Sequence, residues 1–262
     1  MGGEERISAM SVSDFCSAIA ANWISVLAPA ALVALYYRFF GRRRFLAFFG
    51  LDGSRAVTVY VSNLNVPSGT AVALDGAARS YSGGAVPEYE VRLLPTLHRT
   101  FNLLAAGTDR LPDVLKRILA SDIEVNVVGA PTAISALDAD ATIVAVGGPA
   151  YNSAAARLAT EFRPLANVTA DGASLQVEGA SEVMRDLRVA LVQRAIHPST
   201  GQVAFYLVGL SATGTTAAVH FLAHKWRWLH RRFGATKPFC VVLHVTSDDG
   251  RQYTVVKEIE RT

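Results

Sequence analysis

The chain has 262 residues, of which 51% are hydrophobic and 18% charged. This length and composition suit one sizeable folded core plus an additional segment, and they exclude a disordered or disulfide-stapled protein. Five of the 25 basic and three of the 22 acidic residues precede residue 45, so the rest of the chain is nearly neutral and nucleic acid is not an expected partner.

The N-terminal segment is predicted to cross a membrane. Residues 15–37 carry no formal charge, and as a helix these 23 residues would cover about 34 Å, against a hydrocarbon core of about 30 Å. The leader before them is acidic, whereas a secretory signal peptide begins with a basic region. Arg38, Arg42, Arg43 and Arg44 follow the span, so the positive-inside rule places the C-terminal body in the cytoplasm.

We therefore expect a single-pass protein of the cell membrane with two parts. Residues 1–45 are the leader, the transmembrane helix and its basic flank, and residues 46–262 form a cytoplasmic α/β domain. The two cysteines, Cys16 and Cys240, make no disulfide framework and suit a reducing compartment.

Strand and helix signals alternate through the body, as in an α/β domain. Residues 65–87 are rich in Gly, Ser, Ala and Pro and are expected to be a long functional or mobile loop. Pro95 should kink or shorten the helix that contains it. In chain order the expected elements are a strand over 57–61, a helix from 87 or 88 toward 102, a helix over 111–120, strands over 123–128 and 142–146, a helix over 152–162, paired strands over 189–195 and 203–208, a helix ending at 233, and a terminal hairpin over 239–245 and 253–259.

The strands over 123–128 and 142–146 are too apolar and β-branched for surface strands, so both are expected in the buried middle of the sheet. The runs over 189–208 and 239–259 have the lengths and turn residues of antiparallel hairpins. The pattern predicts a mixed sheet with a parallel centre and antiparallel C-terminal additions.

Small polar loops follow three of the expected strands, at Ser62-Asn63, Gly147 to Asn152 and Gly209 to Thr215. Ligands of open α/β sheets bind outside the carboxyl ends of the strands, and a helix N-terminus favours an anion. In the long loop, Arg79 could clamp a phosphate and Tyr81 could stack on a base. The expected ligand-binding residues are Ser62, Asn63, Arg79, Tyr81, Gly147, Gly148, Asn152, Ser211, Gly214 and Thr215. The alternative is that these loops are strand-to-helix turns with their caps, which need no ligand.

Several familiar motifs are absent or incomplete. Neither glycine loop has the dinucleotide spacing, and there is no phosphate-binding Gly-Lys-Ser/Thr loop. The loop around Ser211 is one residue longer than a nucleophile elbow, with His244 and the acids Asp248 and Asp249 following it. His220 and His224 have the spacing of a two-histidine metal site but lack its glutamate, so no metal site is expected.

The order of these pieces resembles an uncharacterised family of bacterial membrane-associated proteins with a Rossmann-like body. The residues concerned are Tyr60-Val61-Ser62-Asn63-Leu64, Asp75-Gly76 with Arg79-Ser80-Tyr81, Gly147-Gly148-Pro149 with Asn152, and Gly209 with Gly214-Thr215. The resemblance covers most of residues 55–245 and implies an architecture, not an activity. A looser similarity joins the strand ending in Ser62-Asn63 to the nucleoside deoxyribosyltransferase-like and TIR-like nucleotide-processing folds, whose members use a catalytic glutamate.

The fold class expected is therefore α/β, with a three-layer Rossmann-like mixed sheet preceded by one transmembrane helix. We expect the domain to bind a nucleotide or similar anionic small molecule as a sensor or effector. One alternative is ester or N-glycosidic hydrolysis in the same crevice, with Glu88 or Glu90 as the acid or Ser211 as the nucleophile. Another is an interaction scaffold without a small ligand. The sequence names no cofactor and leaves catalysis and oligomeric state open.

Overall fold

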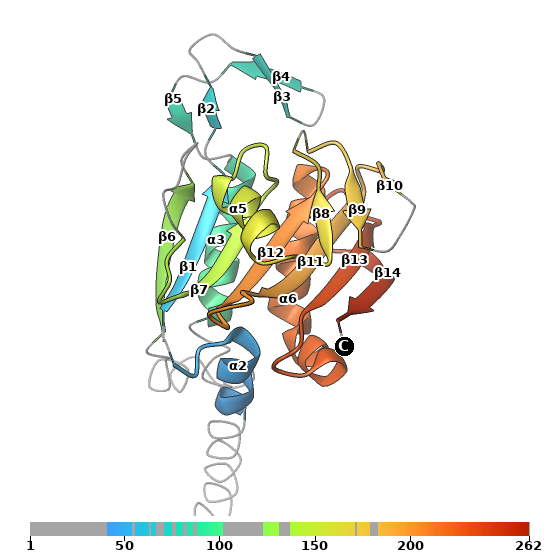
Figure 1. The fold of residues 1–262 in the computed structure, drawn as a ribbon. Coiled ribbons are helices and arrows are strands. Elements are labelled where there is room, and N and C mark those ends of the chain that lie inside the picture. The colour runs from blue at the N-terminus through green and yellow to red at the C-terminus, as the bar shows by residue number, and fades with distance from the viewer. Residues whose placement is uncertain are drawn as a thin grey trace, which may run out of the picture.

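The computed structural model describes residues 41–53, 56–62, 88–101, 123–130, 137–170, 172–178 and 183–261, and the backbone of four short strands between residues 64 and 85. Its centre is a seven-stranded mixed sheet in the order β14-β13-β11-β12-β7-β1-β6 (Figure 1). These strands are β1 (Ala56–Ser62), β6 (Glu124–Ala130), β7 (Thr142–Val146), β11 (Val189–Ile196), β12 (Val203–Gly209), β13 (Phe239–Val245) and β14 (Tyr253–Glu260).

The sheet is mixed, as predicted, but its parallel strands form one half of it and reach an edge, and the antiparallel hairpins form the other half. Strands β6, β1, β7 and β12 run parallel to one another. Strand β11 is antiparallel to both β12 and β13, and β14 is antiparallel to β13. Because β1, β7 and β12 are neighbours, their C-terminal ends meet along one side of the sheet, which we call the carboxyl edge.

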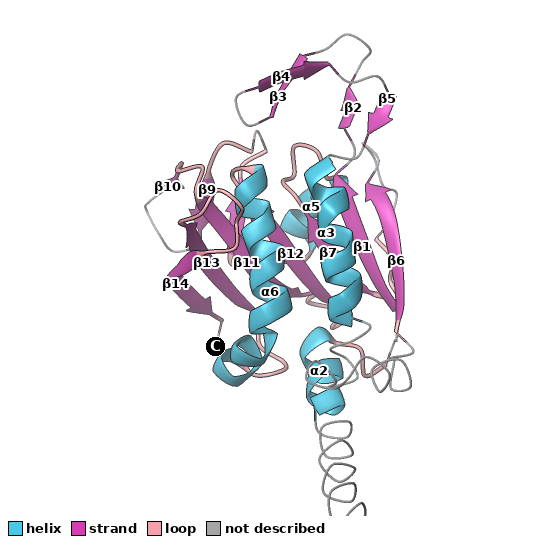
Figure 2. Ribbon diagram, turned by 180° about the vertical axis from the view of Figure 1, so that it is seen from behind, coloured by secondary structure: helices cyan, strands magenta, loops and turns pink. Residues whose placement is uncertain are grey.

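Both faces of the sheet are covered. Helices α3 (Glu88–Arg99) and α6 (Ala212–Phe233) lie on one face (Figure 2). Helix α5 (Ser153–Glu161) and a small antiparallel sheet lie on the other (Figure 1). The small sheet, which the sequence pattern does not predict, contains β8 (Ala166–Val168), β9 (Leu175–Val177) and β10 (Val183–Met184).

Each face has its own buried cluster because side chains alternate along a strand. In β7, Val144 and Val146 join the cluster under α3 and α6, whereas Ile143 and Ala145 join the one under α5. All five β7 residues are buried, which confirms its predicted place in the middle of the sheet.

Helix α2 (Arg42–Phe49) ties the basic flank to the core. Phe45, Phe48 and Phe49 are fully buried. The Phe45 ring lies 5.1 Å from that of Trp226 in α6, centroid to centroid, in an edge-to-face contact. The predicted boundary between residues 45 and 46 thus falls inside α2, and the apolar core of the described structure begins at Phe45.

Strand β6 corrects one prediction. Among the described strands it pairs with β1 alone and forms an edge of the sheet, where Val127 and Val128 are 48% and 37% exposed. The apolar, β-branched composition that suggested a central strand reports β propensity, which edge and central strands share.

Four short strands are described in and beside the stretch over residues 65–87, which the sequence pattern predicts to be a loop. They form two antiparallel pairs, β2 (Leu64–Val66) with β5 (Gly83–Ala85), and β3 (Ala71–Leu74) with β4 (Ala77–Ser80). Figure 1 shows these strands beyond the carboxyl edge of β1.

Helix α3 continues through Pro95 to Arg99, so the proline does not end it at once. The helix expected over 111–120 and the span expected over 15–37 lie outside the described residues. None of the helices in the described part of the chain combines the length and the hydropathy that a membrane crossing needs.

Candidate functional site

The carboxyl edge brings the predicted loops together. Ser62, Gly147, Gly148, Asn152, Ser211, Gly214 and Thr215 follow the ends of the neighbouring strands β1, β7 and β12. Asn63 and Tyr81 lie outside the described residues, and for Arg79 only the backbone, in β4, is described. What decides their role is how the polar atoms of the described residues are used.

Asn152 uses its whole amide inside the protein. Its Nδ2 donates to the carbonyl oxygens of Tyr60 at 3.0 Å and Val146 at 2.7 Å, and its Oδ1 accepts from Ala155 N at 3.1 Å. The side chain is fully buried, caps α5 as predicted and joins β1, β7 and α5. No amide donor is left for a ligand.

The polar side chains of the loop after β12 also form hydrogen bonds within the protein. Ser211 caps α6, since its Oγ accepts from Gly214 N at 3.1 Å and donates to the Leu187 carbonyl at 2.7 Å. Thr215 Oγ1 accepts from Gly209 N at 3.0 Å. A Cβ on Gly209 would lie 2.3 Å from the Gly214 carbonyl carbon, so glycine permits close contact between β12 and α6.

The serine-hydrolase arrangement is not assembled. The Ser211 hydroxyl donates to a backbone carbonyl, and the nearest ionic partner of His244 is Asp186, at 3.3 Å between Nε2 and Oδ2. In the described residues, no three His, Cys, Asp or Glu side chains gather closely enough to hold a metal ion.

Glu90 is the unusual group at the carboxyl edge. Its carboxylate is fully buried and accepts from Ser62 N at 2.6 Å and from the Tyr89 hydroxyl at 2.9 Å. Burial raises its pKa above the ordinary glutamate value, while the hydrogen bonds from Ser62 and Tyr89 oppose that shift. The other predicted acid, Glu88, is exposed and pairs with Arg92 at 2.6 Å.

Gly147 makes room for that carboxylate. Its φ of +94° favours glycine, and an added Cβ would lie 2.4 Å from Ser62 Oγ and 2.6 Å from Glu90 Oε1. The close approach that the glycine loop predicts is therefore made by the protein's own glutamate.

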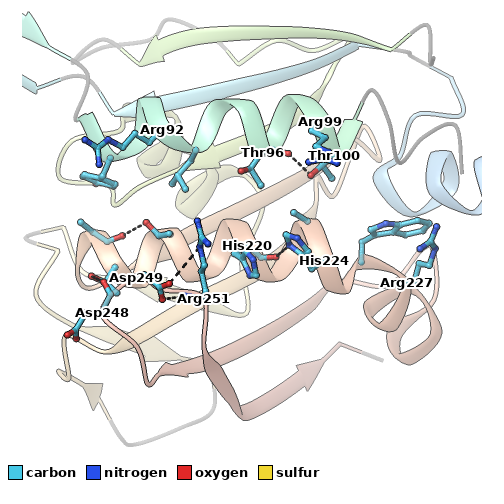
Figure 3. A pocket seen from close by; sticks show the side chains of 17 residues that line it. Arg92, Thr96, Arg99, Thr100, His220, His224, Arg227, Asp248, Asp249 and Arg251 are labelled. Carbon is cyan, nitrogen blue, oxygen red and sulfur yellow. Dashed lines mark hydrogen bonds and ion pairs between the residues drawn. The ribbon is translucent and has the colours of Figure 1, made fainter. Parts of the chain in front are cut away.

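A groove of about 860 Å³ lies between α3 and α6, and none of the predicted ligand-binding residues in the described part of the chain lines it (Figure 3). Its volume is that of a small-molecule site. Its polar lining comes from α3, α6 and the β13–β14 turn and comprises Tyr89, Arg92, Thr96, Arg99, Thr100, Thr213, Thr216, His220, His224, Arg227, Asp248, Asp249 and Arg251.

Some arginines of the groove lie close to carboxylates of the described residues, and Arg99 does not. Near the start of α6, Arg251 lies 3.8 Å from Asp249, between Nε and Oδ2, and Arg92 is paired with Glu88. Further along, the groove is lined by Arg99 from α3 and by His224 and Arg227 from α6 (Figure 3). None of the described carboxylates pairs with Arg99, so this part of the groove favours a negative charge.

His220 and His224 line the groove with two stacked imidazole rings. Their rings stack at 3.9 Å between centroids with 25° between planes, and the His224 Nδ1–H donates to the His220 carbonyl at 2.9 Å. Burial lowers the pKa of His220, as do the charges of His224, Arg251 and Lys225, while Asp249 opposes them. The neutral form of the His220 imidazole is thus favoured.

Comparison with known proteins adds no family or relative. No family model matches the chain, and neither the curated proteins nor the solved structures contain a match to it. The groove was missed in the sequence because its residues come from three segments, and on each helix the arginines and histidines have the pattern of a solvated face.

Proposed function

We propose that this chain is a membrane-anchored Rossmann-like domain of the cytoplasm that binds a nucleotide or similar anionic small molecule, as a sensor or effector. The observation that supports it is the groove between α3 and α6, where Arg92 and Arg99 face Arg227 and Arg251. The proposed ligand class, an anionic small molecule, is the one that the sequence suggests. The proposed binding site is the groove instead of the crevice at the carboxyl edge. The anchor rests on the uncharged segment over residues 15–37.

The lining suits the phosphates and the base of a nucleotide. Arginine binds phosphate through paired N–H donors, and both Arg99 and Arg227 line the same part of the groove. The exposed ring of His224 offers a face on which a base can stack. At the other end, Asp248 and Asp249 can accept hydrogen bonds from the N–H groups of the base.

Thermal unfolding of the full chain in detergent, against a panel of nucleotides, NAD and sugar phosphates, tests the proposal. A ligand at 100 times its Kd adds about 2.7 kcal/mol, so a selective rise in Tm is expected. Arg99→Gln should abolish the rise. No rise with any ligand would contradict binding and favour an interaction scaffold.

A matched variant distinguishes ligand binding in the groove from ligand binding in the crevice at the carboxyl edge. Gly148 lies in the predicted crevice, and an added Cβ would meet only Val208 Cγ2, at an ordinary 3.8 Å. Gly148→Ala should therefore fold normally and keep the ligand-induced rise in Tm. If Gly148→Ala loses the rise and Arg99→Gln keeps it, the ligand binds at the carboxyl edge.

The structure also favours one version of the enzymatic alternative. Glu90 is a buried carboxyl with a raised pKa at the end of β1, and such a carboxyl can act as a general acid. We propose N-glycosidic or ester hydrolysis with Glu90 as the acid as the second candidate function. Ser211 is less suited, because its hydroxyl is committed to the cap of α6.

In this alternative the ligand reacts at the carboxyl edge, and Glu90→Gln is expected to abolish its turnover while keeping the rise in Tm. The amide is close in shape and retains an oxygen acceptor for Ser62 N, so the fold should persist. Product release from that ligand is the measurement, with Glu88→Gln as a control at an exposed position. Turnover that persists in Glu90→Gln would contradict the role of Glu90.

Binding in the groove should tighten at low pH. A bound anion stabilises the imidazolium of His220, whose pKa in the free protein lies below 6.5. Binding therefore takes up a proton, and Kd should fall by at most about sixfold between about pH 7.5 and about pH 5.5 if the His220 pKa rises by about one unit. His220→Gln should flatten the dependence. His197→Gln, in the β11–β12 connection, should leave it unchanged.

A further inference from the structure

The first turn of α2 and the last turn of α6 lie at the same end of the body (Figure 2). The Phe48 ring of α2 lies 6.1 Å from the His230 ring of α6, centroid to centroid. The Phe45 ring lies 5.1 Å from that of Trp226. These contacts fix α2 against α6 and place their exposed residues side by side.

Exposed basic side chains gather at this end. Arg43 and Arg44 extend from the first turn of α2, Arg231 from the last turn of α6, and Lys237 from the segment that follows. Arg232 is also there, but it pairs with Glu258 at 2.7 Å. We call Arg43, Arg44, Arg231 and Lys237 the basic end face.

The pKa of His230 responds to the positive charge at this end of the body. Burial lowers its pKa, and the charges of Arg44 on α2 and Arg194 on β11 lower it further. Arg44 and Arg194 thus act on one side chain from two different elements, so the positive charge of the end is shared between α2 and the body.

The chain before the described structure supplies a partner for this face. The predicted membrane span ends at residue 37, and the described structure begins at residue 41. Only a few residues separate the bilayer from α2, so the basic end face would lie within reach of lipid headgroups. The cytoplasmic leaflet carries anionic lipids, which attract juxtamembrane arginine and lysine.

We propose that the basic end face docks on the anionic headgroups of the cytoplasmic leaflet and fixes the orientation of the body on the membrane. This inference rests on the proposed N-terminal anchor. The turn before β7 carries Asp138 and Asp140, so the attraction is confined to the side formed by α2 and α6. The docked body tilts toward that side, which is also the side of the groove.

Headgroup quenching in vesicles tests the docking. The full chain, with Cys16→Ser and a fluorophore on Thr236→Cys, is reconstituted in phosphatidylcholine with or without phosphatidylserine, each with a headgroup-quencher lipid. Thr236 is exposed beside the face, and Cys240 is fully buried and stays unlabelled. Each basic charge should raise the ratio of docked to undocked bodies by about fivefold, so quenching should be stronger in the anionic vesicles.

Two charge variants make the test specific. Replacing Arg43, Arg44, Arg231 and Lys237 by glutamine should remove the extra quenching. Arg185→Gln with Arg188→Gln, which removes exposed charges before β11 at the opposite end, should keep it. Equal quenching in neutral and anionic vesicles, or extra quenching that survives the fourfold variant, would overturn the docking. Flotation with the vesicles measures membrane anchoring separately, because an anchored chain floats whether or not its body docks.

Discussion

Replacing Asn152 by alanine is expected to cost about 3–5 kcal/mol of the free energy of unfolding. The change leaves the carbonyls of Tyr60 and Val146 and the N–H of Ala155 without their partner, in a site with no exposed surface. Each unsatisfied buried group costs about 1–3 kcal/mol. Denaturant unfolding of the full chain in detergent measures the loss.

Asn152→Asp and Asn167→Ala complete this experiment. The aspartate removes both amide donors and places a carboxylate against two carbonyl oxygens, so its cost should equal or exceed that of alanine. Asn167, in β8, has a buried Oδ1 without a hydrogen-bond partner, and its replacement should cost less than about 1 kcal/mol. An Asn152→Ala variant that keeps its stability and loses ligand would show instead that Asn152 serves the ligand.

The elements that could be predicted are those with local signals. Asn152 as a cap, Ser211 as a cap and Gly234 as the end of α6 all follow from residue types with known positional preferences. The antiparallel pairing of β11 with β12 follows from a short polar connection between two β-branched runs. The position of β6 in the sheet has no such local signal, and its prediction as a central strand was wrong.

The candidate site shows the same limit. The sequence correctly places the loops after β1, β7 and β12 at one edge, because parallel neighbours end together. It does not show that the polar atoms of Asn152 and Thr215 bond to backbone groups. For Asn152 this depends on Tyr60, 92 residues away, and for Thr215 on the close approach of Gly209 N to α6. Gly147 indicates close approach, but only the fold shows that Glu90 approaches it.

The groove depends still more on tertiary structure. Arg99 is in α3, Arg227 in α6 and Arg251 after β13, so their shared surface arises only when both helices pack on the same face of the sheet. In the sequence, the cations in the last turns of α6 suggest dipole stabilisation and solvation. In the fold Arg227 also lines the groove, because α3 lies opposite α6.

Replacing Arg194 by methionine is expected to raise the free energy of unfolding by about 1–4 kcal/mol. Arg194 is 2% exposed, and its Nε and Nη1 have no hydrogen-bond partner in the described part of the chain, while Nη2 donates to the Ala235 carbonyl. Burial lowers its pKa to about 10, so the guanidinium is still charged at pH 7. Its centre lies 5.6 Å from the Phe48 ring centroid, a contact worth about 2 kcal/mol when desolvated, less than the several kcal/mol that burial of an ion costs.

Two readouts distinguish the removal of a buried charge from a general packing effect. In Arg194→Met the pKa of His230 should rise, because one of the two charges that lower it is gone, and NMR titration measures that pKa. Arg194→Lys keeps the buried charge and should gain no stability. If Arg194→Met is instead less stable than the parent chain, the contacts of the guanidinium with the Ala235 carbonyl and the Phe48 ring outweigh the cost of burying its charge.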